Sequence, residues 1–176
     1  VCVVTYNHGK YIGTCLDHIL RQRRKFRIEI LIHDDASTDG AQDVIRAYQK
    51  RYPDIIKPIL RVENQYSQGI TNISGAFNFP RAVGKYVALT DGDDYWCDDY
   101  KLQRQVDYME AHPECGFTFH SAKVVTEDGA LVNGELMRPY HTSRVVKPAE
   151  LVDKATGSPF ASFLLRREIV EKLPDY

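Results

Sequence analysis

Short apolar runs alternate with helical patterns through the first hundred residues of this chain. Residues 1–5 have the composition of a buried strand, and further strands are predicted at 26–33, 55–62 and 85–90. The apolar residues after the first strand recur at the spacing of one helix face: Ile12, Cys15, Leu16 and Ile19. A second helix is predicted after a possible cap at 37–39. This alternation predicts an α/β fold with a mostly parallel central sheet flanked by helices.

The second half of the chain is less regular. Segment 69–83 has the composition of a loop and an irregular helix, and a later helix is expected to end before Pro113. Residues 115–125 predict one strand, and a turn at 127–129 predicts a hairpin into 130–136. The length of 176 residues suits a single domain.

Three carboxylates follow the predicted strand 85–90 within four residues. They are Asp91, Asp93 and Asp94, with Gly92 between the first two. Clustered acids repel one another and lose hydration at a strand end, so such a cluster is usually kept where a cation neutralises it. Oxygen donors favour Mg²⁺ or Mn²⁺ over zinc. The pattern predicts a divalent metal on Asp91 and Asp93; the alternative is an acidic turn whose side chains bond their own backbone.

Polar residues also follow the first two predicted strands. They are Thr5, Tyr6 and Asn7 after the first strand, and Asp34 and Asp35 after the second. Ligands of open α/β sheets bind outside the carboxyl ends of the strands, so we expect these residues to share an edge with the acids. An aromatic ring, hydrogen-bonding carboxylates and a metal site suit a base, a ribose and a diphosphate. Taken singly, each segment could instead be a turn or a helix cap.

The way in which phosphate would be bound is constrained by what the sequence lacks. No Gly-x-Gly-x-x-Gly or Gly-Lys-Ser/Thr segment is present, so a glycine-rich phosphate cradle is unsupported. A diphosphate would depend on the metal instead. The net charge of −1 gives no general basic field, so nucleic acid is not an expected partner.

Cysteine usage and hydropathy predict a cytoplasmic location. The four cysteines have no metal-ligand spacing, so we expect free thiols in a reducing compartment. No apolar run approaches the roughly 18 residues of a membrane span. The basic run 21–25 is best explained as a solvated loop, with peripheral contact to the inner face of the cell membrane as the alternative.

Three ordered segments resemble the signatures of glycosyltransferase family 2. They are VVTYNH at 3–8, DDASTDG at 34–40 and TDGDDYW at 90–96, and residues 112–114 and 159–168 resemble later family segments. The resemblance covers nearly the whole chain. It implies the GT-A fold, with a Rossmann-like sheet, and transfer of a sugar from a nucleoside diphosphate sugar with inversion, most commonly from a UDP-sugar. As a set these motifs are specific for the family and not for the substrate.

The resemblance also implies roles in binding the nucleobase. Tyr6 would stack on the base, with Thr5 and Asn7 along the same wall. Asp35 would accept a hydrogen bond from the base, and Asp34 would support it. Residues 1–98 would then form the nucleotide-sugar-binding half, and 99–176 the start of the acceptor-binding half.

For the acidic segment, the implied roles concern the sugar and the phosphates. Asp91 would face the ribose or the sugar, and Asp93 would ligate the Mn²⁺ or Mg²⁺ that bridges both phosphates. Asp94 would support the site or contact the sugar. Gly92, within the same segment, would also line the site. The acceptor would be a glycan or a lipid-linked molecule, by family habit alone.

Inversion needs a general base, which in the family follows the segment resembling 163–173. Both ends of the chain look cut, so we expect the base beyond Tyr176. The acids inside the chain that remain as candidates are Asp153, Glu168, Glu171 and Asp175. None of them has a spacing that singles it out as a base.

Two rival functions remain open at this stage. A nucleotidyltransferase also joins a nucleotide site to paired acids and a metal, but His8-Gly9-Lys10 is a poor phosphate-binding loop. A nucleotide-sugar binding module without turnover would tolerate loss of the acceptor side. The histidines have no metal-ligand spacing and are expected to be structural, and Trp96 is expected to pack in the core.

Overall fold

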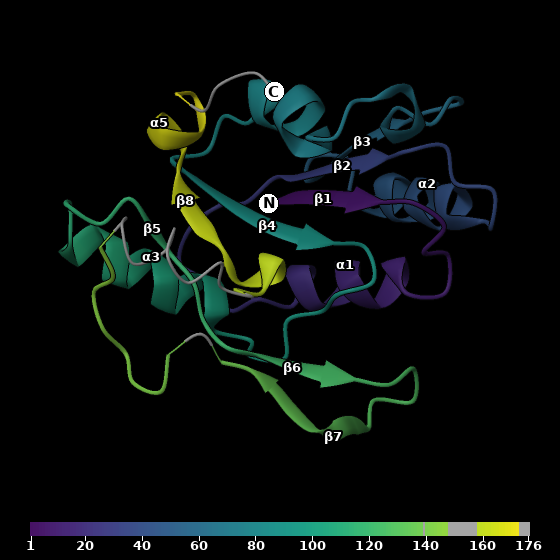
Figure 1. The fold of residues 1–176 in the computed structure, drawn as a ribbon. Coiled ribbons are helices and arrows are strands. Elements are labelled where there is room, and N and C mark those ends of the chain that lie inside the picture. Colours follow the sequence, from purple (N-terminus) through teal and green to yellow (C-terminus); the bar gives the residue numbers. More distant parts are fainter. Residues whose placement is uncertain (139, 148–157, 173–176) are drawn as a thin grey trace.

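The structure is a computed structural model that describes residues 1–138, 140–147 and 158–172. Figure 1 shows a twisted central sheet with helices on both faces. The strands lie in the order β3-β2-β1-β4-β8-β5. They are β1 (Cys2–Thr5), β2 (Ile30–Asp34), β3 (Ile56–Leu60), β4 (Tyr86–Asp91), β5 (Phe117–Thr118) and β8 (Leu164–Arg166).

Strand direction places the carboxyl ends of four strands at one edge of the sheet. β1 is parallel to β2 and to β4, and β2 is parallel to β3. Thr5 pairs with Asp34 and Val4 pairs with Asp91, so β1, β2 and β4 end almost level. β8 runs antiparallel to both β4 and β5. The predicted mostly parallel sheet is confirmed.

Alternate residues along the strands face two apolar layers. The helices are α1 (Ile12–Leu20), α2 (Ala41–Arg51), α3 (Lys101–Ala111) and α5 (Arg167–Val170), with helical turns at Tyr66–Gln68, Ser74–Asn78, Phe79–Arg81 and Phe160–Ser162. Val3 and Ile32 face the larger layer, which α1, α2 and α3 cover. Cys2 and Leu31 face the second layer, which Val170 of α5 helps to close. All four residues of the predicted first helical stripe are buried, as its periodicity required.

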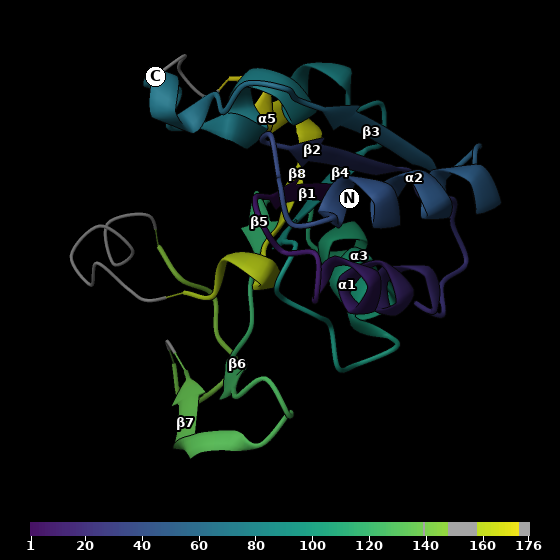
Figure 2. The same cartoon turned by 90° about the vertical axis from the view of Figure 1, so that its right-hand side faces the viewer.

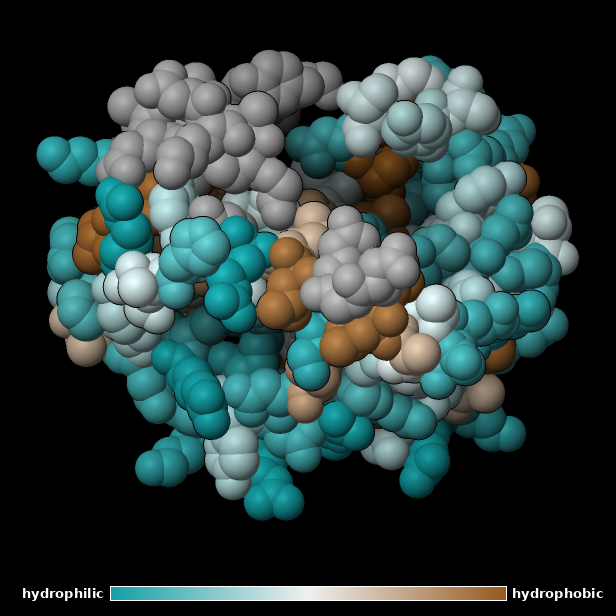
Figure 3. Space-filling view, turned by 60° about the horizontal axis from the view of Figure 1, so that its bottom comes forward, coloured by the Kyte–Doolittle hydropathy of each residue, from teal (hydrophilic) through white to brown (hydrophobic). Residues whose placement is uncertain are grey.

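A hairpin extends from this body. β6 (Ala122–Val125) and β7 (Leu131–Met137) form a separate antiparallel sheet of two strands. Figure 2 shows the hairpin standing away from the central sheet. Leu131, Leu136 and Met137 expose apolar side chains on it. Figure 3 shows apolar areas within a mostly hydrophilic surface on this side of the molecule.

Two of the strand predictions are wrong. Residues 26–29 do not belong to β2, because β1 begins at Cys2, which pairs with Leu31, and offers no strand beyond that point. The single strand predicted at 115–125 is instead β5 and β6, which lie in different sheets. Alternation of apolar residues could not reveal this break, because both halves of the segment are extended.

The N-cap of α2 is Gly40 and not one of the residues 37–39 predicted to cap it, although Asp39 bonds the first helical residue. Oδ1 of Asp39 accepts a hydrogen bond from the N–H of Ala41 at 3.1 Å. Gly40, between them, has φ of 91°, a left-handed conformation that glycine adopts without steric strain. α2 therefore begins at Ala41, directly after the polar loop that follows β2.

Candidate functional site

The residues predicted from the sequence converge at the carboxyl edge of the parallel strands. β1, β2 and β4 end at Thr5, Asp34 and Asp91. The N–H of Asp35 donates to the carbonyl oxygen of Thr5 at 2.9 Å, and the N–H of Gly92 donates to that of Val4 at 2.8 Å. These bonds extend the sheet by one residue past each strand and bring the three loops together.

Asp91 to Asp94 form a tight acidic turn. The N–H of Asp94 donates to the carbonyl oxygen of Asp91 at 3.2 Å. Burial, followed by the charges of Asp94 and Asp93, raises the pKa of Asp91 to about 6. Loss of hydration and then Asp93 also raise the pKa of Asp94. The turn thus holds more negative charge than its surroundings neutralise, which is the electrostatic condition for binding a cation.

His8, the last residue of the VVTYNH segment, lies against this acidic turn, although it was not among the predicted site residues. Its Nε2 is 3.7 Å from Oδ2 of Asp93. Nδ1 of His8 and Oγ1 of Thr5 are buried and have no hydrogen-bond partner among the described residues. Buried polar atoms without a partner are positions where a ligand or a water usually binds. Beside the acids, therefore, two buried polar atoms can still form hydrogen bonds to a ligand.

The donors of the acidic turn fit a hard divalent cation. Within residues 1–138, 140–147 and 158–172, no group of three or more His, Cys, Asp or Glu side chains is arranged to hold a metal. Mg²⁺ is commonly held by one or two carboxylates together with substrate phosphates, rather than by a site made wholly of protein. Asp91 and Asp93 fit a metal shared in this way with a diphosphate.

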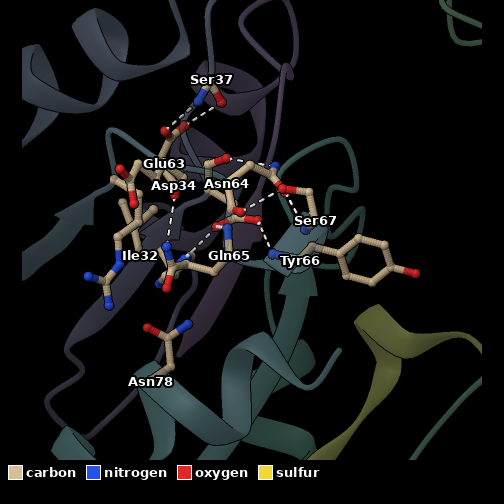
Figure 4. A network of polar contacts seen from close by, with 12 residues as sticks. Ile32, Asp34, Ser37, Glu63, Asn64, Gln65, Tyr66, Ser67 and Asn78 are labelled. Carbon is tan, nitrogen blue, oxygen red and sulfur yellow. Dashed lines mark hydrogen bonds and ion pairs between the residues drawn. The ribbon is translucent and has the colours of Figure 1, made fainter. Parts of the chain in front are cut away.

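Asp34 braces the loop between β2 and α2. Its side chain is fully buried. The carboxylate accepts hydrogen bonds from the N–H of Ser37 at 3.0 Å, the hydroxyl of Ser37 at 2.5 Å and Nε2 of Gln42 at 2.7 Å. Figure 4 shows Asp34 and Ser37 facing one another. Asp34 therefore fixes the loop that carries Asp35.

Asp35 holds a second loop, the turn Tyr66–Gln68. Its Oδ1 accepts hydrogen bonds from the N–H of Gln65 at 2.8 Å and from Nε2 of His33 at 3.2 Å, and its Oδ2 accepts from the N–H of Tyr66 at 3.0 Å. Asp35 is only 2% exposed. One acceptor position on Oδ2 remains for a ligand. Figure 4 shows the ring of Tyr66 pointing away from this network.

Tyr6 is exposed at the edge of the sheet, and Asn7 joins two loops there. Tyr6 is 48% exposed, so the residue is accessible to a ligand. Asn7 has φ of 56°, its Oδ1 accepts from the N–H of Thr38 at 2.8 Å, and its own N–H donates to Oγ of Ser37 at 2.9 Å. Asn7 thus joins the loops after β1 and β2, and it holds Tyr6 at the edge.

Trp96 and His33 are buried and pack within the protein. Trp96 is 4% exposed, and its Nε1 donates to the carbonyl oxygen of Ala161 at 2.9 Å. His33 is fully buried and stacks on Phe77, with ring centroids 4.6 Å apart. The predictions of packing for Trp96 and of a structural role for His33 are confirmed. The four cysteines are free thiols, as predicted.

The candidate bases Glu168, in α5, and Glu171, its C-cap, lie far from the acidic turn. Arg166, just before α5, pairs with Tyr86 at the start of β4, whereas the turn follows the end of β4. Glu168 is exposed, and Glu171 forms an ion pair with Arg167. Glu168 and Glu171 are therefore ordinary surface acids. Two other candidates, Asp153 and Asp175, lie outside the described residues.

Sequence relatives give this geometry a context. The model of glycosyl transferase family 2 matches residues 1–174. An uncharacterised protein of Mycobacterium tuberculosis is 44% identical over 131 residues, 72% of this chain and 36% of that protein. An uncharacterised glycosyltransferase of Nostoc sp. is 33% identical over 180 residues, 98% of this chain and 52% of that protein.

One further relative has a name that states its reaction. It is an Escherichia coli enzyme named UDP-Glc:α-D-GlcNAc-diphosphoundecaprenol β-1,3-glucosyltransferase, 33% identical over 112 residues, 62% of this chain and 40% of that enzyme. The chain spans about half the length of these relatives, or less.

Solved structures share the fold. S. aureus TarS matches with a TM-score of 0.65 and 20% identity over 97% of this chain and 47% of that one, and its complex with UDP-GlcNAc matches with a TM-score of 0.59. The mannosyltransferase PcManGT of Pyrobaculum calidifontis, in complex with GDP-Man and Mn²⁺, matches with a TM-score of 0.64 and 19% identity over 99% of this chain and 46% of that one. At these identities the likeness shows the fold alone, and the predicted GT-A fold is confirmed.

Proposed function

The chain belongs to glycosyl transferase family 2, and on this premise we propose that it carries the donor site of an inverting, metal-dependent glycosyltransferase. The donor would be a nucleoside diphosphate sugar, bound at the carboxyl edge of β1, β2 and β4. The observation that carries this proposal is the acidic turn, where unneutralised charge meets two unpartnered polar atoms. The proposed donor-binding residues are Thr5, Tyr6, Asn7, Asp34, Asp35, Asp91, Gly92, Asp93 and Asp94.

Within this site, each side chain would act on a different part of the donor. The ring of Tyr6 would stack on the base. Asp91 and Asp93 would hold Mn²⁺ or Mg²⁺, which when bound neutralises charge that builds on a departing diphosphate. Gly92 allows the acids to lie against Thr5 without a side chain between them. Asp94, at the exposed end of the turn, would contact the sugar.

Inversion would require a base on the face of the sugar opposite the diphosphate. Glu168 and Glu171 are at the far end of β4 from the acidic turn, and the family resemblance implies a base beyond Tyr176. The chain described here would then bind donor and metal, and turnover would need the longer protein. This division also distinguishes an enzyme from a binding module, which would show no turnover at any length.

The finer identity of the substrates is proposed from relatives. A UDP-sugar is favoured by the UDP-Glc in the name of the E. coli relative and the UDP-GlcNAc of the TarS complex, whereas PcManGT binds GDP-Man. The same E. coli name supports a lipid-linked glycan acceptor. None of the helices in the described part of the chain has the length and hydropathy to cross a bilayer. Peripheral contact of the basic run 21–25 with the cytoplasmic membrane face stays a prediction.

Calorimetric titration with UDP, GDP, ADP and TDP, each with and without Mn²⁺, tests the donor site. We expect one diphosphate to bind, and only when Mn²⁺ is present. Binding of that diphosphate with equal affinity in chelator would contradict the proposed metal role. Failure of all four to bind both this chain and the longer protein would overturn the donor site itself.

A further inference from the structure

Side chains of α1 and of Gln22, just after its C-cap, contact the backbone of residues 91–98 at three points. Cys15 Sγ contacts the carbonyl oxygen of Asp91 at 3.5 Å, His18 Nδ1 contacts that of Trp96 at 2.8 Å, and Gln22 Nε2 donates to that of Asp98 at 2.8 Å. Cys15 and His18 are three residues apart, so they lie on one face of α1, and Gln22 follows the C-cap of the helix. The order of contacts is the same along both segments.

We propose that His18 is a positioning residue for the acidic turn, acting through Tyr95 and Trp96 without contacting the donor. This inference extends the proposed function, because the benefit of a fixed turn is metal binding. A carbonyl oxygen can only accept, so Nδ1 of His18 carries the hydrogen and donates it to Trp96. The same imidazole meets Tyr95 edge-on, with ring centroids 4.8 Å apart and an angle of 72° between the planes.

The turn is short, so fixing its two ends fixes most of its length. At its start, the N–H of Gly92 donates to Val4 in the sheet. At its end, His18 holds Trp96, whose indole is anchored separately by its hydrogen bond to Ala161. Only residues 92–95 lie between Asp91 and Trp96. Little backbone freedom remains to be lost when the carboxylates bind a cation.

The contacts of His18 with Tyr95 and Trp96, called the anchor below, matter because the acids repel one another. Asp91, Asp93 and Asp94 place three like charges within four residues of one tight turn. Without a cation, this repulsion favours opening of the turn. The hydrogen bond of His18 to the carbonyl oxygen of Trp96 and its ring contact with Tyr95 oppose that opening.

His112 provides a matched control for the local chemistry of His18. Its Nδ1 contacts the carbonyl oxygen of Tyr108 at 2.8 Å, and its ring stacks on Tyr108 with centroids 4.1 Å apart. Like His18, it combines a hydrogen bond to a carbonyl oxygen with a contact to a tyrosine ring, here stacked and not edge-on. Because it follows the end of α3 and not the acidic turn, its loss should affect stability without affecting the turn.

Amide hydrogen exchange of the metal-free protein tests the anchor directly. We expect His18→Ala to speed exchange in residues 91–98 by about tenfold, the scale of a lost hydrogen bond plus an aromatic contact. His18→Phe, which keeps a ring, should speed it less, and His18→Asn, whose amide can donate from a similar position, should stay within about twofold of wild type. His112→Ala should leave exchange in this segment unchanged.

Titration with Mn²⁺ at saturating UDP, or the diphosphate found to bind, links the anchor to the site. We expect His18→Ala to weaken the Mn²⁺ affinity about tenfold and His112→Ala to leave it unchanged. Wild-type exchange in both His18→Ala and His18→Phe, or an equal effect of His112→Ala on residues 91–98, would overturn the proposal. If exchange changes as expected but wild type binds no diphosphate, the proposed function fails while the anchoring role stands.

Discussion

Thr5 leaves no room for a side chain on Gly92. A β-carbon on Gly92 would lie 2.5 Å from Oγ1 and 2.7 Å from Cβ of Thr5, well inside van der Waals contact. Thr5 is itself buried at the end of β1 and cannot move away without disturbing the sheet. The end of β4 therefore lies against the end of β1 only because position 92 is glycine.

Gly92→Ala should accordingly destabilise the protein by about 1–3 kcal/mol, the usual range for an overpacked site. Gly13→Ala is the matched control, because a β-carbon there would meet nothing closer than 3.7 Å and the position lies inside α1. It should stabilise by roughly 0.5–1 kcal/mol. Urea unfolding of both variants measures the difference, and equal stability of Gly92→Ala and wild type would contradict the close contact.

The raised pKa of Asp91 predicts a pH dependence of stability. A carboxyl whose pKa is higher in the folded state, here about 6, destabilises the fold when it is ionised. This loss of stability develops as pH rises from about 4 to 6 and is complete above 6. In chelator, Asp91→Asn should be more stable than wild type by on the order of 1 kcal/mol at pH 7 and equal to it near pH 3, because partial solvation reduces the effect. Thermal unfolding from pH 3 to 8 checks this, and a difference that does not vary with pH would contradict it.

Asp93→Ala should abolish the Mn²⁺-dependent part of diphosphate binding while leaving the fold intact. Asp93 is exposed and makes few packing contacts, so removing it takes charge from the site and little from the core. Calorimetry with the bound diphosphate measures the affinity. Asp43→Ala, which removes an exposed carboxylate of α2 that pairs with Arg46, is the control. Unchanged Mn²⁺ dependence in Asp93→Ala would remove this carboxylate from the metal site.

Tyr6→Ala should weaken diphosphate binding by about 1–3 kcal/mol, the scale of an aromatic ring stacked on a base. Tyr6→Phe keeps the ring and should bind as wild type does. Tyr66→Ala distinguishes the two exposed tyrosines, because the ring of Tyr66 points away from the network around Asp35. A normal affinity in Tyr6→Ala would mean that the base lies elsewhere.

The sequence predicted the elements of the site better than the contacts that hold them. Apolar periodicity located β1, α1 and β4. Because the acids come at the end of β4, their place at the carboxyl edge of the sheet could also be predicted. His18 and Gln22 escaped notice because their partners are backbone carbonyls more than seventy residues away, which leave no pattern in the sequence. The boundaries of β2 could not be predicted for a related reason. A strand extends only as far as a neighbouring strand pairs with it, whatever the apolar character of its further residues.

Lys101 is the clearest case in which burial opposes the fold. It is 4% exposed, burial lowers its pKa to about 7, and its Nζ lies 3.9 Å from the centroid of the Trp96 ring. Because the folded pKa is below the unfolded value, the destabilisation is complete below pH 7 and disappears as pH rises towards 10.5. The contact with the indole offsets part of it.

Lys101→Met should therefore raise stability at pH 7 by about 2 kcal/mol, and this gain should shrink steadily as the pH approaches 10. Lys123→Met, at an exposed position of β6, should change stability little at either pH. Chemical unfolding of wild type and both variants at pH 7 and pH 10 supplies the comparison. A loss of stability in Lys101→Met at pH 7 would mean that the ammonium over Trp96 contributes more than its desolvation costs, and the segment after the acidic turn would then depend on that charge.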